Sequence, residues 1–131
     1  TLRLPYRLAP DPKGGLALLV EDSEELRATF RDMLIGLGYS VIEATSVDEA
    51  SALAADIPDI ALVLSDVRLE GEATGIDLAQ RLKGSHLPII LMTSLPPSDP
   101  QFRMALKSGP VLQKPFTTQQ LSALITPETP A

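Results

Sequence analysis

Cysteine is absent from this chain, and histidine occurs once, as His86. The lack of cysteine excludes disulfide bonds, thiolate zinc sites and cysteine nucleophiles, and a single histidine excludes a metal site built from several imidazoles. Tryptophan is absent too, and aromatic residues make up only 4% of the chain, which weakens any site that stacks nucleic-acid bases. These absences remove thiol and multi-imidazole chemistry from consideration.

Long hydrophobic runs are also missing. The longest uninterrupted apolar stretches, such as IALVL and IILM, fall far short of the roughly 20 residues that a membrane-spanning helix needs. The first fifteen residues, TLRLPYRLAPDPKGG, lack the apolar centre of a signal peptide. The sequence therefore predicts no membrane segment.

Positive charge is scarce as well. Lys and Arg total 11 against 17 Asp and Glu, a net charge of -6, whereas a general nucleic-acid-binding domain needs a basic face for phosphates. We therefore expect no nucleic-acid partner. The imbalance is local, because 14 of the acids lie in residues 21–77. Most of them are expected to form solvated helix faces, and a few are expected to converge in one site.

What is present is enough for one domain. Of the 131 residues, 44% are hydrophobic and 21% charged, so the chain can bury a core. Residues 1–15 are rich in proline and glycine, which is typical of a linker or the tail of a preceding domain. We expect the folded domain over residues 16–126 and a disordered tail over residues 127–131.

Five apolar, strand-like segments alternate with five segments of helical periodicity. The predicted strands are residues 16–20, 39–44, 60–66, 87–94 and 110–114. Three helix starts are marked by capping boxes or by proline after an N-cap, at Ser46–Glu49, Asp99-Pro100 and Thr117–Gln120. In the last two helices, the residues expected to face the core are Phe102, Leu106, Leu121, Leu124 and Ile125.

Alternation of strands and helices with short connections predicts an α/β doubly wound fold around a five-stranded parallel sheet. Right-handed crossovers place helices on both faces of such a sheet. Ligands bind outside the carboxyl ends of its strands. The candidate site should therefore lie where the predicted strands end.

Acidic, hydroxyl and basic side chains follow the predicted strands at that edge: Glu21-Asp22, Asp66, Thr93-Ser94 and Lys114. Each acid taken alone is expected more often to cap a helix than to serve a site, but together three nearby carboxylates need a cation. Their hard oxygens suit Mg²⁺. A lysine and a hydroxyl beside them are typical of phosphoryl transfer, with Asp66, central in the sheet, as the acceptor. No glycine-rich phosphate loop follows the first strand, so neither a dinucleotide fold nor a P-loop is supported.

This ordered set resembles the receiver domain of two-component response regulators. The resemblance covers about residues 16–126 and rests on LLVEDSEELR, LVLSDVRLEGEATGIDLA, IILMTS and VLQKPF. It implies a flavodoxin-like (βα)5 fold with strand order 2-1-3-4-5 and a cytoplasmic signalling role. It also implies that the domain assists its own phosphorylation and dephosphorylation without being an ordinary enzyme.

The resemblance further implies a role for each site residue. Asp66 would be the phosphoacceptor and a Mg²⁺ ligand. Asp22 would bind Mg²⁺ directly, Glu21 mainly through water, and Arg68 through its backbone carbonyl, its side chain being solvated. We expect the ion to be held by these four positions.

The same resemblance assigns the phosphoryl contacts. Thr93 would hydrogen-bond the phosphoryl group and move with it, and Lys114 would pair with a phosphoryl oxygen, with a cis bond between Lys114 and Pro115. The donor or acceptor would be a phosphohistidine on a histidine kinase or a histidine phosphotransfer domain. His86, in the turn before the fourth strand, is expected to be a surface residue and not such a donor.

Two features set this chain apart from many family members. Val111 stands three residues before Lys114, where the family often has an aromatic switch residue, so a swinging ring cannot report phosphorylation here. The VLQKPF ending is similar to receivers attached to hybrid sensor histidine kinases, and TLRLPY resembles the last strand of a kinase ATP-binding domain. We therefore expect a piece of a longer protein, the C-terminal receiver of a hybrid kinase.

Two other functions remain open at this point. One is a phosphorylation-independent interaction scaffold with a receiver fold, which Val111 favours and the complete set of acids disfavours. The other is a Mg²⁺ phosphatase with an aspartyl nucleophile on a similar sheet. Such an enzyme is expected to carry a second acid two residues after its nucleophile, and Arg68 occupies that position after Asp66.

Overall fold

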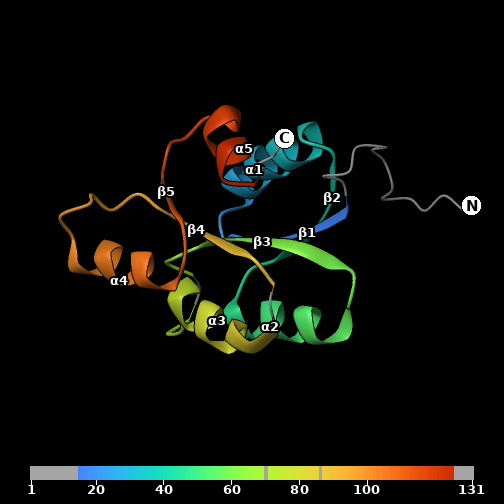
Figure 1. The fold of residues 1–131 in the computed structure, drawn as a ribbon, viewed down its shortest axis with the longest axis horizontal. Helices are drawn as coiled ribbons and strands as arrows, with labels where there is room; N and C mark the ends of the chain where they lie inside the picture. Colours follow the sequence, from blue (N-terminus) through green and yellow to red (C-terminus); the bar gives the residue numbers. More distant parts are fainter. Residues whose placement is uncertain (1–14, 70, 86, 126–131) are drawn as a thin grey trace, which may run out of the picture.

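The computed structural model describes residues 15–69, 71–85 and 87–125. In this part of the chain, five parallel strands form one sheet with the order β2-β1-β3-β4-β5 (Figure 1). The strands are β1 (Gly15–Val20), β2 (Tyr39–Ala44), β3 (Ile60–Asp66), β4 (Ile89–Thr93) and β5 (Val111–Gln113). The helices are α1 (Glu24–Gly36), α2 (Val47–Asp56), α3 (Gly75–Arg81), α4 (Pro100–Ser108) and α5 (Thr118–Ile125), with a short 3-10 turn at Lys83–Ser85. The predicted fold and strand order are confirmed.

Helices cover both faces of the sheet, with α1 and α5 on one side and α2 and α3 on the other (Figure 1). Side chains alternate between the two faces along a strand, and β1 shows this. Ala17 and Leu19 belong to the core beneath α1 and α5, whereas Leu16, Leu18 and Val20 belong to the core beneath α2 and α3. A strand that is buried on both faces has a continuous run of apolar residues. Such runs made it possible to predict β1 and β3 from the sequence.

Two of the three predicted helix starts are confirmed in full, and the third in part. At α2, Ser46 accepts a hydrogen bond from the backbone N–H of Glu49, but the Glu49 carboxylate accepts from the N–H of Thr45, one residue before the position that a capping box requires. Asp99 caps α4 by accepting a hydrogen bond from the backbone N–H of Gln101, and a proline follows it at the first helical position. Thr117 and Gln120 exchange the two bonds of a capping box at α5. A second capping box, Thr74 with Asp77 at α3, was not among the predictions.

Two residues predicted to face the core are exposed, so those predictions are wrong. Leu106 is 53% exposed. Helix α4 buries Phe102 and Ala105, and Leu106, the next residue after Ala105, points roughly 100° away from that buried face. Leu124 is 38% exposed, because Ile125, four residues after the buried Leu121, takes the inward position on α5. Both errors come from short helices whose narrow buried face admits few side chains.

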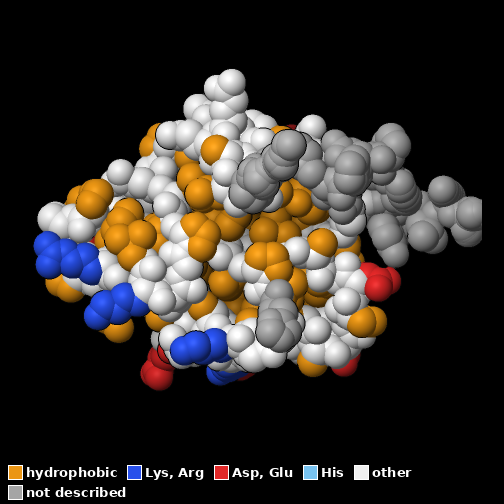
Figure 2. Space-filling view, in the orientation of Figure 1, with side chains coloured by type: hydrophobic (Ala, Val, Ile, Leu, Met, Phe, Trp, Pro, Cys, Tyr) orange, Lys and Arg blue, Asp and Glu red, His pale blue; other side chains and the backbone are white. Residues whose placement is uncertain are grey.

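The face shown in Figure 2 carries many hydrophobic side chains across its middle. The structure also has a cavity of about 400 Å³ bordered by Tyr39, Ile89 and Pro110, at the starts of β2, β4 and β5. It therefore lies at the amino ends of the strands, away from the edge where the predicted site residues gather.

Some predictions fall on residues that the structure does not describe. These are the linker or kinase-domain tail before residue 15, the exposed position of His86, and the tail after residue 126. Strand β1 begins at Gly15, one residue inside the predicted linker. Among the described residues, none of the helices combines the length and the hydropathy needed to cross a bilayer.

Candidate functional site

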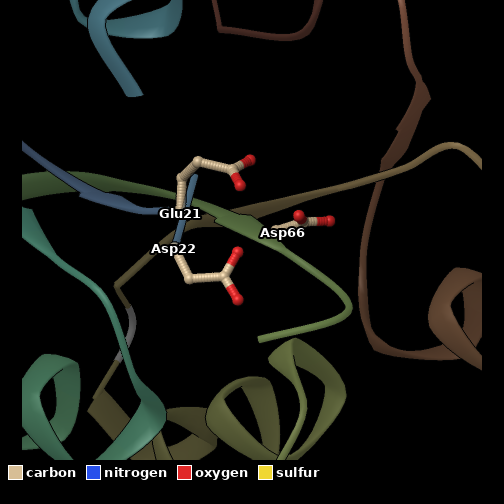
Figure 3. A group of neighbouring side chains, drawn as sticks. All are labelled: Glu21, Asp22 and Asp66. Carbon is tan, nitrogen blue, oxygen red and sulfur yellow. The ribbon is translucent and has the colours of Figure 1, made fainter. Parts of the chain in front are cut away.

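Three carboxylates meet where β1 and β3 end. The two strands are parallel neighbours with Val20 opposite Ser65, so the residues that follow, Glu21 and Asp22 on one and Asp66 on the other, emerge side by side (Figure 3). One oxygen from each carboxylate lies within 4.8 Å of the others. The order of the strands reverses direction between β1 and β3, which is the place where doubly wound sheets bind ligands.

The three carboxylates differ in burial. Glu21 is 1% exposed and Asp66 6% exposed, whereas Asp22 is open to solvent. Burial raises the pKa of Glu21 to about 7, and the neighbouring charge of Asp66 adds to the shift, against a hydrogen bond from the backbone N–H of Ser23 to Oε2. The cluster is thus mostly buried, with Asp22 facing solvent; these three carboxylates are called the acidic pocket below.

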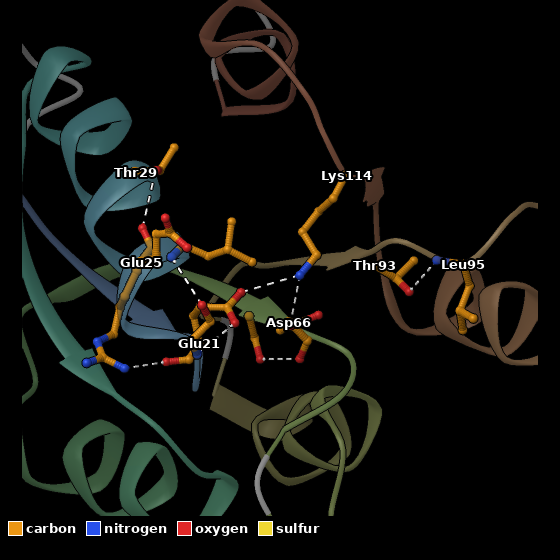
Figure 4. Close-up of polar contacts among 11 residues, drawn as sticks. Glu21, Glu25, Thr29, Asp66, Thr93, Leu95 and Lys114 are labelled. Carbon is orange, nitrogen blue, oxygen red and sulfur yellow. Dashed lines mark hydrogen bonds and ion pairs between the residues drawn. The ribbon is translucent and has the colours of Figure 1, made fainter.

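Lys114, just after β5, forms ion pairs with two of these carboxylates. Its Nζ lies 3.0 Å from Oδ2 of Asp66 and 3.4 Å from Oε1 of Glu21 (Figure 4). The ammonium also lies 6.0 Å from the centre of the Phe30 ring, and Phe30 stacks on Phe116 with centroids 5.1 Å apart. These rings form an apolar wall beside the lysine stem, which limits the positions the ammonium can take.

The peptide bond between Lys114 and Pro115 is cis, as predicted. Backbone contacts tie the lysine to the neighbouring strand, because the N–H of Lys114 donates to the carbonyl of Thr93 over 2.8 Å. This hydrogen bond joins Lys114 and Thr93 at the carboxyl edge of the sheet.

Thr93 ends β4 and is 2% exposed. Its hydroxyl oxygen accepts a hydrogen bond of 3.1 Å from the backbone N–H of Leu95 (Figure 4). A hydroxyl that accepts still has its own proton to donate, so Thr93 can serve a second partner at the strand edge.

Arg68 and Val111 lie at the margins of the cluster. Arg68 lies two residues past Asp66 with an exposed side chain, as the sequence predicted. Val111 packs with the small apolar cluster of Val67, Leu91 and Ala105, so this position contributes to the core between β4, β5 and α4.

Two positions that support the site were missed by the sequence analysis. Gly75 begins α3, where an added Cβ would overlap the carbonyl oxygen of Asp66, so only glycine permits this approach of helix to strand end. Arg27, counted only as a charge, donates from Nη1 to the carbonyl of Glu21 over 2.9 Å. A signal for Arg27 did exist: a basic residue in the opening turns of a helix opposes the helix dipole, which indicates a specific partner.

The donor set fits a hard divalent cation. Among the described residues, Lys114 pairs with two of the three carboxylates, Glu21 and Asp66, and both of these are buried, so one ammonium faces a cluster of three acids. Carboxylate oxygens with one solvent-facing side suit Mg²⁺, which binds through one or two carboxylates and keeps several waters. Fold and site together define a doubly wound α/β domain with an acidic, cation-demanding pocket at its switch point.

Comparison with known sequences agrees with this description. Residues 17–126 match the family model of the response regulator receiver domain. The chain is 33% identical over 116 residues to the phosphate regulon transcriptional regulatory protein PhoB of Pseudomonas aeruginosa, covering 84% of this chain and 49% of PhoB. It is 33% identical over 110 residues to the transcriptional regulatory protein CpxR of Klebsiella pneumoniae, covering 82% of this chain and 46% of CpxR. The chain thus spans about half the length of these curated relatives.

Solved structures give the same result. The signal receiver domain of a modulated diguanylate cyclase from Desulfovibrio desulfuricans G20 is 34% identical with a TM-score of 0.74, covering 85% of this chain and 90% of that one. The receiver domain of the sensor histidine kinase PA1611 from Pseudomonas aeruginosa PAO1 is 26% identical with a TM-score of 0.75, covering 86% of this chain and 94% of that one. Its structure holds a magnesium ion coordinated in the active-site cleft. The chain belongs to the response regulator receiver domain family of two-component signalling.

Proposed function

We propose that this receiver accepts a phosphoryl group from phosphohistidine onto Asp66, in a reaction that depends on Mg²⁺. The observation that carries the proposal is the convergence of three carboxylates within 4.8 Å with Lys114 Nζ at 3.0 Å from Oδ2 of Asp66. An acceptor carboxylate, a cation site and a fixed positive charge are the parts that phosphoryl transfer needs.

Asp22 and Asp66 would hold the ion directly, Glu21 mainly through water, and Arg68 through its backbone carbonyl. The buried position of Glu21 and the open position of Asp22 support this division, because water and phosphate oxygens can enter from the side of Asp22. When bound, Mg²⁺ supplies positive charge to the phosphoryl oxygens and offsets the repulsion among the carboxylates.

In the transfer, a carboxylate oxygen of Asp66 attacks phosphorus. The bond between phosphorus and the imidazole nitrogen of the donor breaks, and its electron pair stays on that nitrogen. The imidazole is released neutral, either because its other ring nitrogen already carries a proton or because the departing nitrogen takes one from water. The product is an aspartyl phosphate. Hydrolysis then forms inorganic phosphate and restores the carboxylate, whereas attack by a second histidine passes the phosphoryl group on.

Lys114 and Thr93 would stabilise and report the phosphorylated state. The Lys114 ammonium already touches Asp66, so a phosphoryl group on Asp66 meets a positive charge held in place. Thr93 keeps a proton to donate while its oxygen accepts from Leu95. A phosphoryl group that engages both side chains favours one of two surface states, which is a shift of populations. With Val111 packed in the core between β4 and β5, this response runs through the Leu95 backbone and not through an aromatic ring at that position.

The partner we propose is a histidine kinase or a histidine phosphotransfer domain. The likeness to the receiver of sensor histidine kinase PA1611 supports this partner class and the proposal that the chain is part of a hybrid kinase. The PhoB and CpxR matches support the alternative of a stand-alone regulator. Sequencing the parent gene on both sides of this segment separates the two.

Incubation with MgCl₂ and a small phosphodonor, followed by intact-mass measurement, tests the function. We expect a gain of one phosphoryl group in the native chain, no gain in Asp66→Asn, and a normal gain in Asp48→Asn, an exposed acid on α2 that pairs with Arg81. No gain in the native chain, or an equal gain in Asp66→Asn, would contradict the proposal.

A further inference from the structure

The turn that carries Glu21 and Asp22 is held by an ion-pair relay from outside the acidic pocket. Arg27 uses two nitrogens at once: Nη1 donates to the carbonyl of Glu21 over 2.9 Å, and Nε pairs with Oε1 of Glu43 over 3.0 Å. Arg31 pairs with the other oxygen, Oε2 of Glu43, over 2.8 Å. The relay therefore runs from Arg31 through Glu43 and Arg27 to the backbone beside the carboxylates.

Arg27 is the member of this relay placed to act on the site. Its side chain is 18% exposed, against 40% for Arg31. It contacts the turn, whereas Arg31 donates to Glu43. A planar guanidinium can donate in two fixed directions, and a lysine ammonium cannot reproduce that fork. Arg27 thus links β2, which carries Glu43, to the end of β1.

Other hydrogen bonds of the turn engage its N–H groups and the Glu21 side chain. The N–H of Glu21 donates to Ala44, the N–H of Ser23 to Oε2 of Glu21, and the N–H of Arg27 to the carbonyl of Ser23. The side chain of Arg27 donates a hydrogen bond to the carbonyl of Glu21 and so restrains it, and rotation of that peptide would redirect both flanking carboxylates. Mutation of a group that hydrogen-bonds to a metal ligand and orients it, without touching the metal, typically lowers metal affinity by about 10–100-fold.

We propose that Arg27 is a positioning residue for the cation site: by holding the carbonyl of Glu21 against Glu43, it sets the direction in which Glu21 and Asp22 present their carboxylates to Mg²⁺. The inference rests on the proposed function of the acidic pocket, and it adds a residue that touches neither the ion nor the phosphoryl group. It assigns to Glu43 the role of holding Arg27 and to Arg31 the role of a peripheral pair.

The Arg27→Gln variant distinguishes an effect of charge from an effect of positioning, because the two change the affinity for Mg²⁺ in opposite directions. Removing a positive charge close to a cation site should tighten Mg²⁺ binding if charge alone matters. Loss of positioning should weaken it. Arg31→Gln removes the same charge from the same helix and from the same acid, without touching the turn, so it is the matched control.

The test is Mg²⁺ affinity measured by calorimetry or by amide chemical shifts, at a temperature where thermal melts show each variant folded. We expect Arg27→Gln to weaken binding about tenfold and Arg31→Gln to stay within about twofold of the native chain. If Arg27→Gln does not fold, Arg27→Lys serves instead: it keeps the charge and loses the fork, so weaker binding than in the native chain is still expected.

Unchanged or tighter binding in Arg27→Gln, or equal weakening in Arg31→Gln, would overturn the inference while leaving the magnesium site in place. A lower melting temperature with unchanged affinity would also overturn it, because that is the result of a purely structural role. A native chain that binds no Mg²⁺ would instead overturn the proposed function, so the two failures are distinguishable.

Discussion

Lys114 and Asp66 form an ion pair of 3.0 Å across an intervening strand. Asp66 ends β3 and Lys114 follows β5, and β4 lies between them in the sheet. The pair joins groups separated by 48 residues in sequence. Lys114 also contacts Glu21, which follows β1 on the far side of β3. One side chain therefore connects the carboxyl ends of β5, β3 and β1.

Replacing Lys114 by Gln should slow phosphorylation of Asp66 by about 100-fold, because removal of one preorganised charged donor typically costs that much in rate. The rate is measured from intact mass against time with a small phosphodonor and saturating Mg²⁺. Lys107→Gln, an exposed lysine on α4, is the control and should match the native rate. Equal rates in both variants would show that Lys114 does not act on the phosphoryl group.

The stability of the metal-free chain should depend on pH through Glu21. Its pKa is about 7 in the folded state against 4.5 unfolded, so between these values the folded state holds a proton that the unfolded state has lost. This contribution is fully present below pH 4.5, falls as pH rises and is lost above about 7. Its size is about 3 kcal/mol.

Urea unfolding in EDTA at pH 5 and pH 8 measures this effect. We expect the free energy of unfolding of the native chain to fall over this range relative to Glu21→Gln, whose amide does not titrate. Added Mg²⁺ should stabilise the native chain more at pH 8 than at pH 5, because the ion binds the ionised carboxylate. Parallel pH profiles for the two chains in EDTA would contradict the assignment to Glu21.

Gly75→Ala should destabilise the fold by about 1–3 kcal/mol, since the added methyl meets the carbonyl of Asp66 and forces α3 or the end of β3 to move. Chemical denaturation gives the free energy of unfolding. Gly36→Ala is the matched control, because a Cβ there meets nothing within 4 Å and lies inside α1, so it should be neutral or slightly stabilising. Equal effects at the two positions would show that the contact at Gly75 relaxes freely.

Thr93→Val should separate phosphorylation from its readout. Valine keeps the shape of threonine but removes the hydroxyl that accepts from Leu95 and that we expect to donate to the phosphoryl group. The amide signal of Leu95 should shift on phosphorylation in the native chain and hardly shift in the variant, while Asp66 still gains its phosphoryl group. Thr29→Val, at an exposed threonine that bonds within α1, should leave the Leu95 response unchanged; a full response in Thr93→Val would contradict the role of the hydroxyl.

Much of the site could be predicted because its residues follow strands that are easy to recognise. Runs such as IALVLSD are apolar on both faces, so their ends are sharply marked, and parallel strands bring their carboxyl ends to one edge. The strand ends therefore predict that the following residues gather at one edge: Glu21, Asp22, Asp66, Thr93 and Lys114. The errors at Leu106 and Leu124 arose where short helices leave periodicity ambiguous by one residue.

The sequence by itself determined the order of elements, the edge at which the polar residues gather and the chemical types that meet there, because these follow from local periodicity and the handedness of crossovers. Tertiary structure alone decided which carboxylates are buried, that Lys114 contacts both Glu21 and Asp66, that Gly75 must lack a side chain, and that Arg27 holds the Glu21 carbonyl. Those facts depend on distances between segments far apart in the chain. Burial and pairing are properties of the folded neighbourhood, and no local pattern carries them.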